Sequence, residues 1–302
     1  MCPLRKSKYQ GGGVTITIAA ATDIGKVRSH NEDAYQALGG EKSPPGVDAV
    51  LLVADGMGGH AAGEVASGMT VTGVTELLVS EGQESAQLDG PDYGVFLGGV
   101  LQRVNSNVLE AAQDPAKKGM GTTCTLAVIK KGKVFLAHIG DSRAYLLRDG
   151  TLHQVTTDHS WVEEAVSQGL LSREEARVHP NRNVITRAIG IKSQAEIDNK
   201  IIALEDGDLL LLCSDGLTSM VPDEEIEEIL KTRDLAHTCK ALIDAANNYG
   251  GHDNTTVVVA AVGAHKKRPA QTRTNATVQK TMEIPRRLPI WKSVIRKLLR
   301  RS

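Results

Sequence analysis

The sequence lacks most of the features that mark specialised protein classes. Aromatic residues make up only 3% of the 302 residues, so the core must consist mainly of Val, Leu, Ile and Ala. The four cysteines are widely spaced without a CxxC pair, which argues against a disulfide framework or a zinc site and fits a reducing cytosol. No signal peptide is apparent, and no run reaches the roughly 18 apolar residues of a spanning helix. We therefore expect a cytoplasmic protein of one large domain or two small ones.

Charge is nearly balanced overall but unevenly distributed along the chain. The net charge is −1, yet residues 264–302 hold 12 of the 35 basic residues and only one of the 36 acidic ones. The tail therefore carries +11 and residues 1–263 carry −12. Such asymmetry favours a tail that meets an anionic surface.

The pattern of apolar residues predicts an α+β fold with largely antiparallel sheets. Hairpin signals at Lys131-Gly132-Lys133 and Asp149-Gly150 join neighbouring strands directly. Helices are expected where apolar residues recur at helical spacing or where capping signals occur. The predicted strands cover residues 14–20, 49–54, 122–129, 134–139, 144–147, 152–155, 209–213 and 255–262, and the predicted helices cover 61–80, 93–112, 224–231 and 235–248.

Composition divides the chain into five predicted segments. Residues 1–13 are expected to form a flexible leader and 14–263 the folded domain, with a polar inserted flap at about 158–187. A Thr- and Asn-rich linker is expected over 264–285. In residues 286–302, apolar side chains including Trp291 occupy one side of a helical pattern and basic side chains the other, which predicts a basic amphipathic helix.

Short acidic motifs spread over 220 residues are the most informative feature. Several of them follow apolar runs, where strand ends can bring distant carboxylates together, and hard divalent cations take such oxygen ligands. Asp-Gly is also an ordinary turn dipeptide, so we interpret Asp149-Gly150, in the middle of a hairpin, as a turn. The motifs are Asn31-Glu32-Asp33, Asp55-Gly56-Met57-Gly58-Gly59, Gly140-Asp141-Ser142-Arg143, Ser214-Asp215-Gly216 and Asp253-Asn254.

The ordered set of motifs resembles the metal-dependent protein serine/threonine phosphatases of the type 2C class, in their bacterial branch. Residues 22–34 (TDIGKVRSHNEDA) resemble the first family motif and residues 53–60 (VADGMGGH) the second. Later motifs follow in the family's order, and the resemblance covers about residues 15–262. These later matches are Gly121-Thr122-Thr123, residues 138–143 (HIGDSR), residues 213–217 (CSDGL) and Asp253-Asn254-Thr255-Thr256.

This resemblance implies a four-layer α-β-β-α sandwich, with helix pairs flanking two sheets and a dinuclear metal cleft at one end. It implies that Arg28 holds the substrate phosphate and that Glu32 supports the metal cluster through water. Two Mn²⁺ or Mg²⁺ ions are expected, with a third, weaker ion at Asp141 and Asp215. The implied ligands of the ion pair are Asp33, Asp55, the carbonyl of Gly56, Asp215 and Asp253, of which Asp55 and Asp215 are, with Arg28, the expected catalytic residues.

The implied reaction is hydrolysis of phosphoserine and phosphothreonine in proteins by a metal-activated water. Met57 stands where animal members have a histidine that is proposed as the general acid. The bacterial branch shows the same substitution. A metal-bound water or His60 are therefore the alternatives for the role of general acid. Two other functions stay open. One is a non-catalytic protein that binds phosphoproteins, and the other is a phosphatase of small phosphorylated metabolites.

The implied partners are phosphoprotein substrates and a cognate bacterial serine/threonine kinase. The 286–302 helix is expected to contact an anionic membrane at its inner face, a partner protein or the acidic body of its own chain. Nucleic acid is the least favoured partner of the tail, and a monomer is expected.

Overall fold

Two antiparallel sheets organise the part of the chain that the structure describes. The structure is a computed structural model, and it describes residues 5–11, 14–58, 61–232 and 234–263. The first sheet has the strand order β1-β2-β12-β11-β8-β9. Its strands are β1 (Arg5–Gly11), β2 (Val14–Asp23), β8 (Arg143–Arg148), β9 (Thr151–Gln154), β11 (Leu209–Cys213) and β12 (Thr255–Val262).

The second sheet has the order β10-β7-β6-β4-β3, and the short strand β5 pairs with the end of β4. Every strand pair among the described residues is antiparallel, as the hairpin signals predict. The turn residues Lys131 and Asp149 both adopt positive φ, which suits tight hairpins. The strands are β3 (Asp33–Gly39), β4 (Ala49–Met57), β5 (Gly121–Thr122), β6 (Cys124–Lys130), β7 (Lys133–Ile139) and β10 (Asp198–Ala203).

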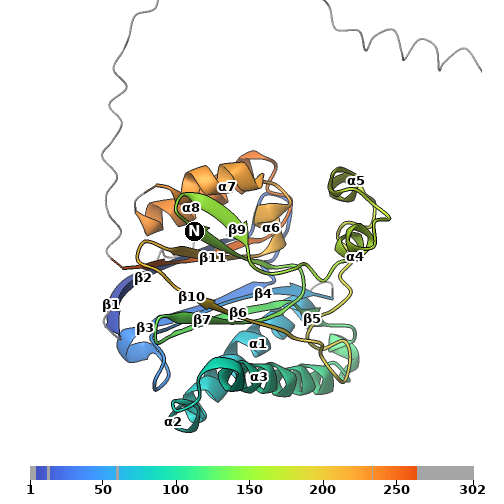
Figure 1. The fold of residues 1–302 in the computed structure, drawn as a ribbon. Helices are drawn as coiled ribbons and strands as arrows, with labels where there is room; N and C mark the ends of the chain where they lie inside the picture. The colour runs from blue at the N-terminus through green and yellow to red at the C-terminus, as the bar shows by residue number, and fades with distance from the viewer. Residues whose placement is uncertain (1–4, 12–13, 59–60, 233, 264–302) are drawn as a thin grey trace, which may run out of the picture. The chain divides into compact units, whose positions relative to one another are not determined.

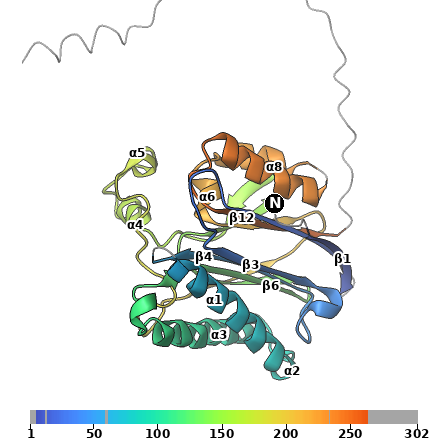
Figure 2. The same ribbon diagram turned by 180° about the vertical axis from the view of Figure 1, so that it is seen from behind.

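Helices cover the outer faces of both sheets. The pair α1 (Ala61–Ser80) and α3 (Gly90–Ala111) lies on the second sheet, and the pair α7 (Asp223–Leu230) and α8 (Leu235–Asn248) lies on the first (Figure 1). The opposite view shows the same succession of layers (Figure 2). The predicted four-layer α-β-β-α sandwich is therefore confirmed. The short helices are α2 (Gly82–Ser85), α4 (Trp161–Ser167), α5 (Arg173–Val178) and α6 (Asp215–Thr218).

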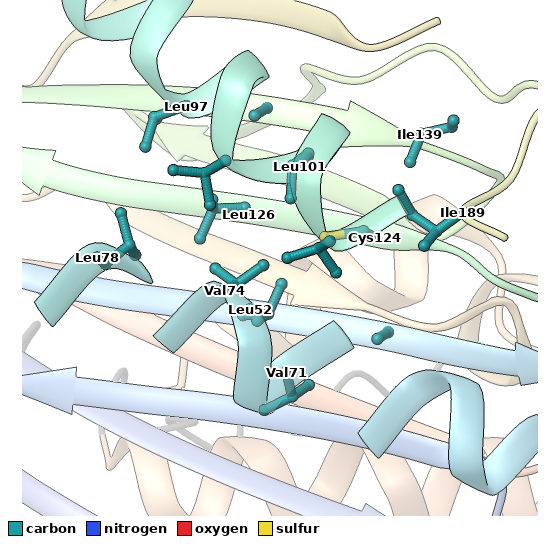
Figure 3. Packing of buried hydrophobic residues seen from close by; sticks show 14 of the residues in the cluster. Leu52, Val71, Val74, Leu78, Leu97, Leu101, Cys124, Leu126, Ile139 and Ile189 are labelled. Carbon is teal, nitrogen blue, oxygen red and sulfur yellow. The ribbon is translucent and has the colours of Figure 1, made fainter. Parts of the chain in front are cut away.

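Three apolar layers fill the spaces between these four. Strand β4 shows why, because its successive residues face two different layers: Leu52 packs toward the helices and Leu51 toward the other sheet. Figure 3 shows the helix-side layer, where Leu52 and Leu126 meet Val74 of α1 and Leu101 of α3. A third layer joins β11 and β12 to α7 and α8. Burying both faces requires continuous apolar strands, which is the pattern that the sequence has.

Helices α3, α4, α5 and α8 begin at polar N-cap residues whose side chains accept a backbone hydrogen bond, and the start of α3 differs from the prediction. Helix α3 begins at Gly90 rather than at the predicted residue 93, because Asp89 is the N-cap and accepts a hydrogen bond from the Gly90 N–H. Pro91 follows in the first turn, where its missing N–H costs nothing. None of the helices in the described part of the chain combines the length and the apolar character needed to span a bilayer.

Strands at sheet edges depart most from the sequence predictions. The predicted flexible leader contains β1, whose residues Arg5–Gly11 pair with β2 from Ala20 to Val14. Strands β3 and β10 were also absent from the predicted set, and their side chains are largely half-buried or exposed. An edge strand forms because its neighbour offers unpaired backbone groups, which its own sequence does not reveal. The predicted linker 264–285 and helix 286–302 lie outside the described residues.

Candidate metal centre

Four strand ends bring acidic residues from both sheets together. Asp33 opens β3 directly opposite Asp55 in β4, so the two carboxylates are cross-strand neighbours. Asp215 follows β11 as the first residue of α6, and Asp253 precedes β12. Strands β11 and β12 are adjacent in the first sheet, as β3 and β4 are in the second. The predicted ion-pair ligands therefore converge at one end of the two sheets.

Ser214 links the two sheets within this cluster. Its hydroxyl donates to Asp33 Oδ2 at 2.7 Å and accepts a hydrogen bond from the Thr256 N–H at 2.9 Å. Asp55 is held on its other side, where its N–H donates to Thr123 Oγ1 at 2.9 Å. The sequence prediction assigned no role to either hydroxyl, although both lie inside the quoted motifs.

Burial and mutual repulsion raise the pKa of these carboxyl groups. Burial, opposed by hydrogen bonds from Thr256 and Ser214, raises the pKa of Asp33 to about 7. Burial and the charge of Asp253 raise the pKa of Asp215 to about 6, and a hydrogen bond from Asp55 works against that rise. The pKa of Asp55 lies well above its usual range, because its carboxyl is buried and faces Asp33 and Asp215. A cation bound among these carboxylates would stabilise their charged forms.

Asp141 joins the cluster from the turn between β7 and β8. Burial and the charge of Asp215 hold the pKa of Asp141 well above its usual range. Its Oδ1 is buried without a hydrogen-bond partner, and so are Asp33 Oδ1 and Glu32 Oε1. Buried carboxylate oxygens without partners are costly in a folded protein. The three unpaired oxygens therefore point to a ligand that the polypeptide itself does not supply.

Gly56 permits the close approach of three segments at this site. Its N–H donates to the Glu32 carbonyl at 3.1 Å. A Cβ at this position would collide with the carbonyl groups of both Gly63 in α1 and Glu32. Only glycine therefore lets the end of β4 lie against the first turns of α1 and the Glu32 backbone.

Arg28 lies at the exposed rim of the cluster. Its guanidinium donates to Asp253 Oδ2 at 2.7 Å, and its side chain is 50% exposed. The hydrogen bond to Asp253 is the main cause that raises the pKa of Arg28, so the group stays charged. An exposed guanidinium beside buried carboxylates can offer its free N–H groups to an anion from solvent.

The residues present fit divalent cations by donor type, burial and charge. Asp oxygens and a backbone carbonyl are the ligands that Mg²⁺ and Mn²⁺ prefer. Within the ranges that the structure describes, no three acidic, histidine or cysteine side chains converge on one point as ion ligands do. The fit therefore depends on the unpaired oxygens and on the repulsion among the carboxylates.

Other predicted residues lie apart from the cluster or outside the description. Asp149 occupies the turn between β8 and β9, as expected of a hairpin residue. Arg143 pairs with Asp158 at 2.7 Å and with Tyr145, contacts that stabilise the Asp141 turn. The predicted flap carries α4 and α5, which stand beside the stacked layers (Figures 1 and 2). His60 lies outside the described residues.

The sequence matches the model of a known protein family. The model for protein phosphatase 2C matches residues 26–253, which include Arg28 and every acidic residue of the cluster. The chain belongs to the protein phosphatase 2C family. Membership confirms the resemblance that the ordered acidic motifs carry.

Similar proteins of this family come from several bacteria. A serine/threonine phosphatase of Listeria welshimeri is 43% identical over 241 residues, which span 79% of this chain and 92% of the relative. The S. agalactiae serine/threonine phosphatase structure is 36% identical with a TM-score of 0.75, covering 82% of this chain and 99% of its own. The catalytic domain of the phosphatase PstP, solved with two manganese ions, is 37% identical with a TM-score of 0.71, covering 83% of this chain and all of its own. The manganese complex and the carboxylates of this protein phosphatase 2C together support dependence on a divalent metal.

Proposed function

We propose that this protein phosphatase 2C hydrolyses phosphoserine and phosphothreonine in proteins with the help of two Mn²⁺ or Mg²⁺ ions. The observation that carries the proposal is the cluster of buried carboxylates with unpaired oxygens beside the exposed Arg28 guanidinium. It joins a site for hard cations to a site for a phosphate. The similar proteins are named serine/threonine phosphatases, which supports the same substrate class.

Each residue has a distinct proposed task. Asp33, Asp55, Asp215 and Asp253 would hold the ion pair with the carbonyl of Gly56. Glu32 would support it through water, and Asp141 with Asp215 would hold a third, weaker ion. When bound, two such cations lower the pKa of a water and orient it for in-line attack on phosphorus.

The chain's own groups position the substrate and the ligands. Ser214 holds the Asp33 carboxylate through a 2.7 Å hydrogen bond, and the Asp55 backbone is fixed to Thr123. Arg28 would bind two oxygens of the phosphate with its planar fork, so that charge and orientation are set together. Met57 cannot donate a proton to the leaving alkoxide, and the donor, a water or His60, stays a prediction.

A phosphothreonine peptide with Mn²⁺ tests the proposal directly. We expect phosphate release by the wild type and a loss of roughly a thousandfold in kcat/KM in Asp215→Asn, because metal ligation contributes several kcal/mol to such transition states. Asp149→Asn is the matched control, since it makes the same change in a hairpin turn far from the cluster, and it should leave kcat/KM unchanged.

Two outcomes would replace the proposal. Mn²⁺ binding without turnover of any phosphoester would indicate the non-catalytic phosphoprotein-binding function. Turnover confined to small phosphorylated metabolites would indicate a metabolite phosphatase instead of a protein phosphatase.

The proposed partners are phosphoproteins and the serine/threonine kinase that phosphorylates them. For the 286–302 segment, contact with an anionic membrane or a partner protein stays a prediction, as do the monomeric state and the cytoplasmic location. Co-sedimentation with anionic vesicles, with and without residues 286–302, would test the membrane contact. Binding that survives the deletion would rule it out.

A further inference from the structure

One buried amide holds both ends of the loop that carries Arg28. Asn254 is only 4% exposed, and its Nδ2 donates to the Ile24 carbonyl and to the His30 carbonyl, each at 2.9 Å. Its Oδ1 accepts the Glu32 N–H at 2.8 Å. The two N–H groups of a single side chain therefore join backbone positions on either side of Arg28. We refer to residues 24–30 as the Arg28 loop.

This arrangement fixes the orientation of the amide without ambiguity. Carbonyl groups only accept hydrogen bonds, so the two carbonyls require the NH₂ side, and the Glu32 N–H requires the oxygen. Both donors and the acceptor of Asn254 are thus used by backbone groups of one segment. Two of its hydrogen bonds hold the two ends of the Arg28 loop and the third holds Glu32, two residues beyond it, so Asn254 acts on the geometry of this loop.

The Arg28 loop also needs this support because its outer part is exposed. Residues 26–30 are exposed, and Val27 is 64% exposed. Near its start, Gly25 has φ +82° and passes so close to Asp253 that a Cβ there would collide with the Asp253 carbonyl. The Lys26 N–H donates to the Gly251 carbonyl at 2.7 Å. These contacts fix the start of the loop, whereas Asn254 also reaches its end at His30.

We propose that Asn254 is a positioning residue that sets the Arg28 guanidinium at the phosphate side of the carboxylate cluster. The inference rests on the proposed function, in which Arg28 binds the substrate phosphate. Asn254 adjoins Asp253, the residue with which Arg28 pairs, so one short segment supplies both the ion pair and the loop support. Its effect reaches the substrate only through Arg28.

Coupling between Asn254 and Arg28 is the measurement that tests this. We expect Asn254→Ala to raise KM for a phosphothreonine peptide about tenfold at saturating Mn²⁺, with kcat changed less than about threefold, as for one or two lost hydrogen bonds. In an Arg28→Ala background the same substitution should change KM less than about twofold, because residues that act through one another are not additive. Equal effects in both backgrounds would overturn the proposal.

Asn105 provides a matched control. It is also a buried amide that ties a loop, because its Nδ2 donates to the Lys192 carbonyl at 2.9 Å and its Oδ1 accepts the Gly190 N–H at 2.8 Å. Asn105→Ala should lower thermal stability as much as Asn254→Ala does. Its effect on KM should be the same with and without Arg28.

Asn254→Asp separates the donors from the shape of the side chain. It keeps the acceptor for the Glu32 N–H but sets a carboxylate oxygen against the carbonyls of Ile24 and His30. We expect a larger rise in KM than in Asn254→Ala, and a KM equal to that of the wild type would overturn the proposal. This variant also serves if Asn254→Ala does not fold.

Hydrogen exchange gives a readout that needs no turnover. In protein without added metal, Asn254→Ala should speed amide exchange at Lys26 and Glu32, while Asn105→Ala should not. Unchanged exchange would overturn the loop support even if the enzyme is active. If the wild type does not hydrolyse the peptide while exchange responds as expected, the proposed function fails and the loop support stands.

Discussion

Lys130 and the carboxylate cluster are both buried and ionisable, but the fold supplies hydrogen-bond partners for only one of them. Lys130 is fully buried, and its Nζ donates to the carbonyls of Ser85, Ala86 and Leu88 at 3.0, 2.9 and 2.8 Å. Three donors thus meet three acceptors, and the ammonium lies 4.3 Å from the centre of the Tyr93 ring. The carboxylate cluster keeps unpaired buried oxygens at Glu32, Asp33 and Asp141.

The difference separates a structural charge from a functional one. Burial lowers the pKa of Lys130, but every N–H of its ammonium is used, so the fold alone satisfies the charge. Burial and repulsion raise the pKa of the carboxyl groups, and the fold leaves them short of partners. A buried charge that is satisfied holds elements together, whereas one that is left short indicates a site for a ligand.

Lys130→Met gives the largest expected effect on stability. It removes three charge-assisted hydrogen bonds, to the carbonyls of Ser85, Ala86 and Leu88, so we expect a loss of about 4 kcal/mol in the free energy of unfolding at neutral pH. The folded enzyme should keep its kcat/KM, because Lys130 lies at the end of β6 away from the carboxylates. Urea unfolding and peptide hydrolysis measure the two quantities.

Lys133→Met is the control for this comparison. Lys133 pairs with Asp89 at 3.1 Å on the surface, with 37% of its side chain exposed. An exposed pair contributes no more than about 1 kcal/mol. A similar loss in both variants would contradict the structural role of Lys130.

His138 tests a buried group whose neutral form is favoured by burial. It hydrogen bonds Thr125 Oγ1 and the Thr157 carbonyl, and burial, followed by repulsion from His159, lowers its pKa to about 4. The unfolded value is about 6.5. Between these values the unfolded state binds more protons, so this contribution is full above about pH 6.5 and falls away toward pH 4.

The shift corresponds to about 3 kcal/mol between pH 7 and pH 4. In His138→Gln, which cannot be protonated, the free energy of unfolding should fall by about that much less over the same range. Urea unfolding of both proteins without added metal measures the difference. Parallel curves would show that His138 is not held neutral.

Metal addition gives a smaller effect that distinguishes the two charged sites. Mn²⁺ at a hundred times its Kd should raise the free energy of unfolding by about 2.7 kcal/mol in the wild type. The Lys130→Met variant should gain as much stability from Mn²⁺, because the substitution lies away from the carboxylate cluster. In Asp215→Asn, a tenfold weaker affinity or more would reduce the gain by at least about 1.3 kcal/mol. Equal gains in all three would contradict a metal site at Asp215.

The interior of this fold could be predicted from the sequence far better than its edges. Strands β11 and β12 and helix α8 have the predicted bounds, because continuous apolar runs and strong caps define them. Strand β3 (DAYQALG) has no such pattern, since six of its seven residues are only half-buried. It forms because β4 offers a free edge.

The sequence also predicted only part of the candidate site. The acidic motifs indicated which carboxylates gather, but the cross-strand pairing of Asp33 with Asp55 exists only because β3 forms. The roles of Ser214 and Asn254 depend on distances between segments 181 to 230 residues apart in sequence. Polar residues next to a buried apolar strand were the available signal, and it does not name their partners.

The double-faced packing of β4 makes its register the most sensitive property of the molecule. Its residues alternate between the helix-side layer and the layer between the sheets, and Asp55 lies two residues before its end at Met57. One residue inserted before Asp55 would exchange the two faces or carry the carboxylate past Asp33. Replacements of side chains in β4 by others of similar volume can be tolerated, but an insertion or deletion within the strand cannot. We therefore expect insertions and deletions to leave the fold intact only in segments that do not fix the spacing between β4 and its neighbours.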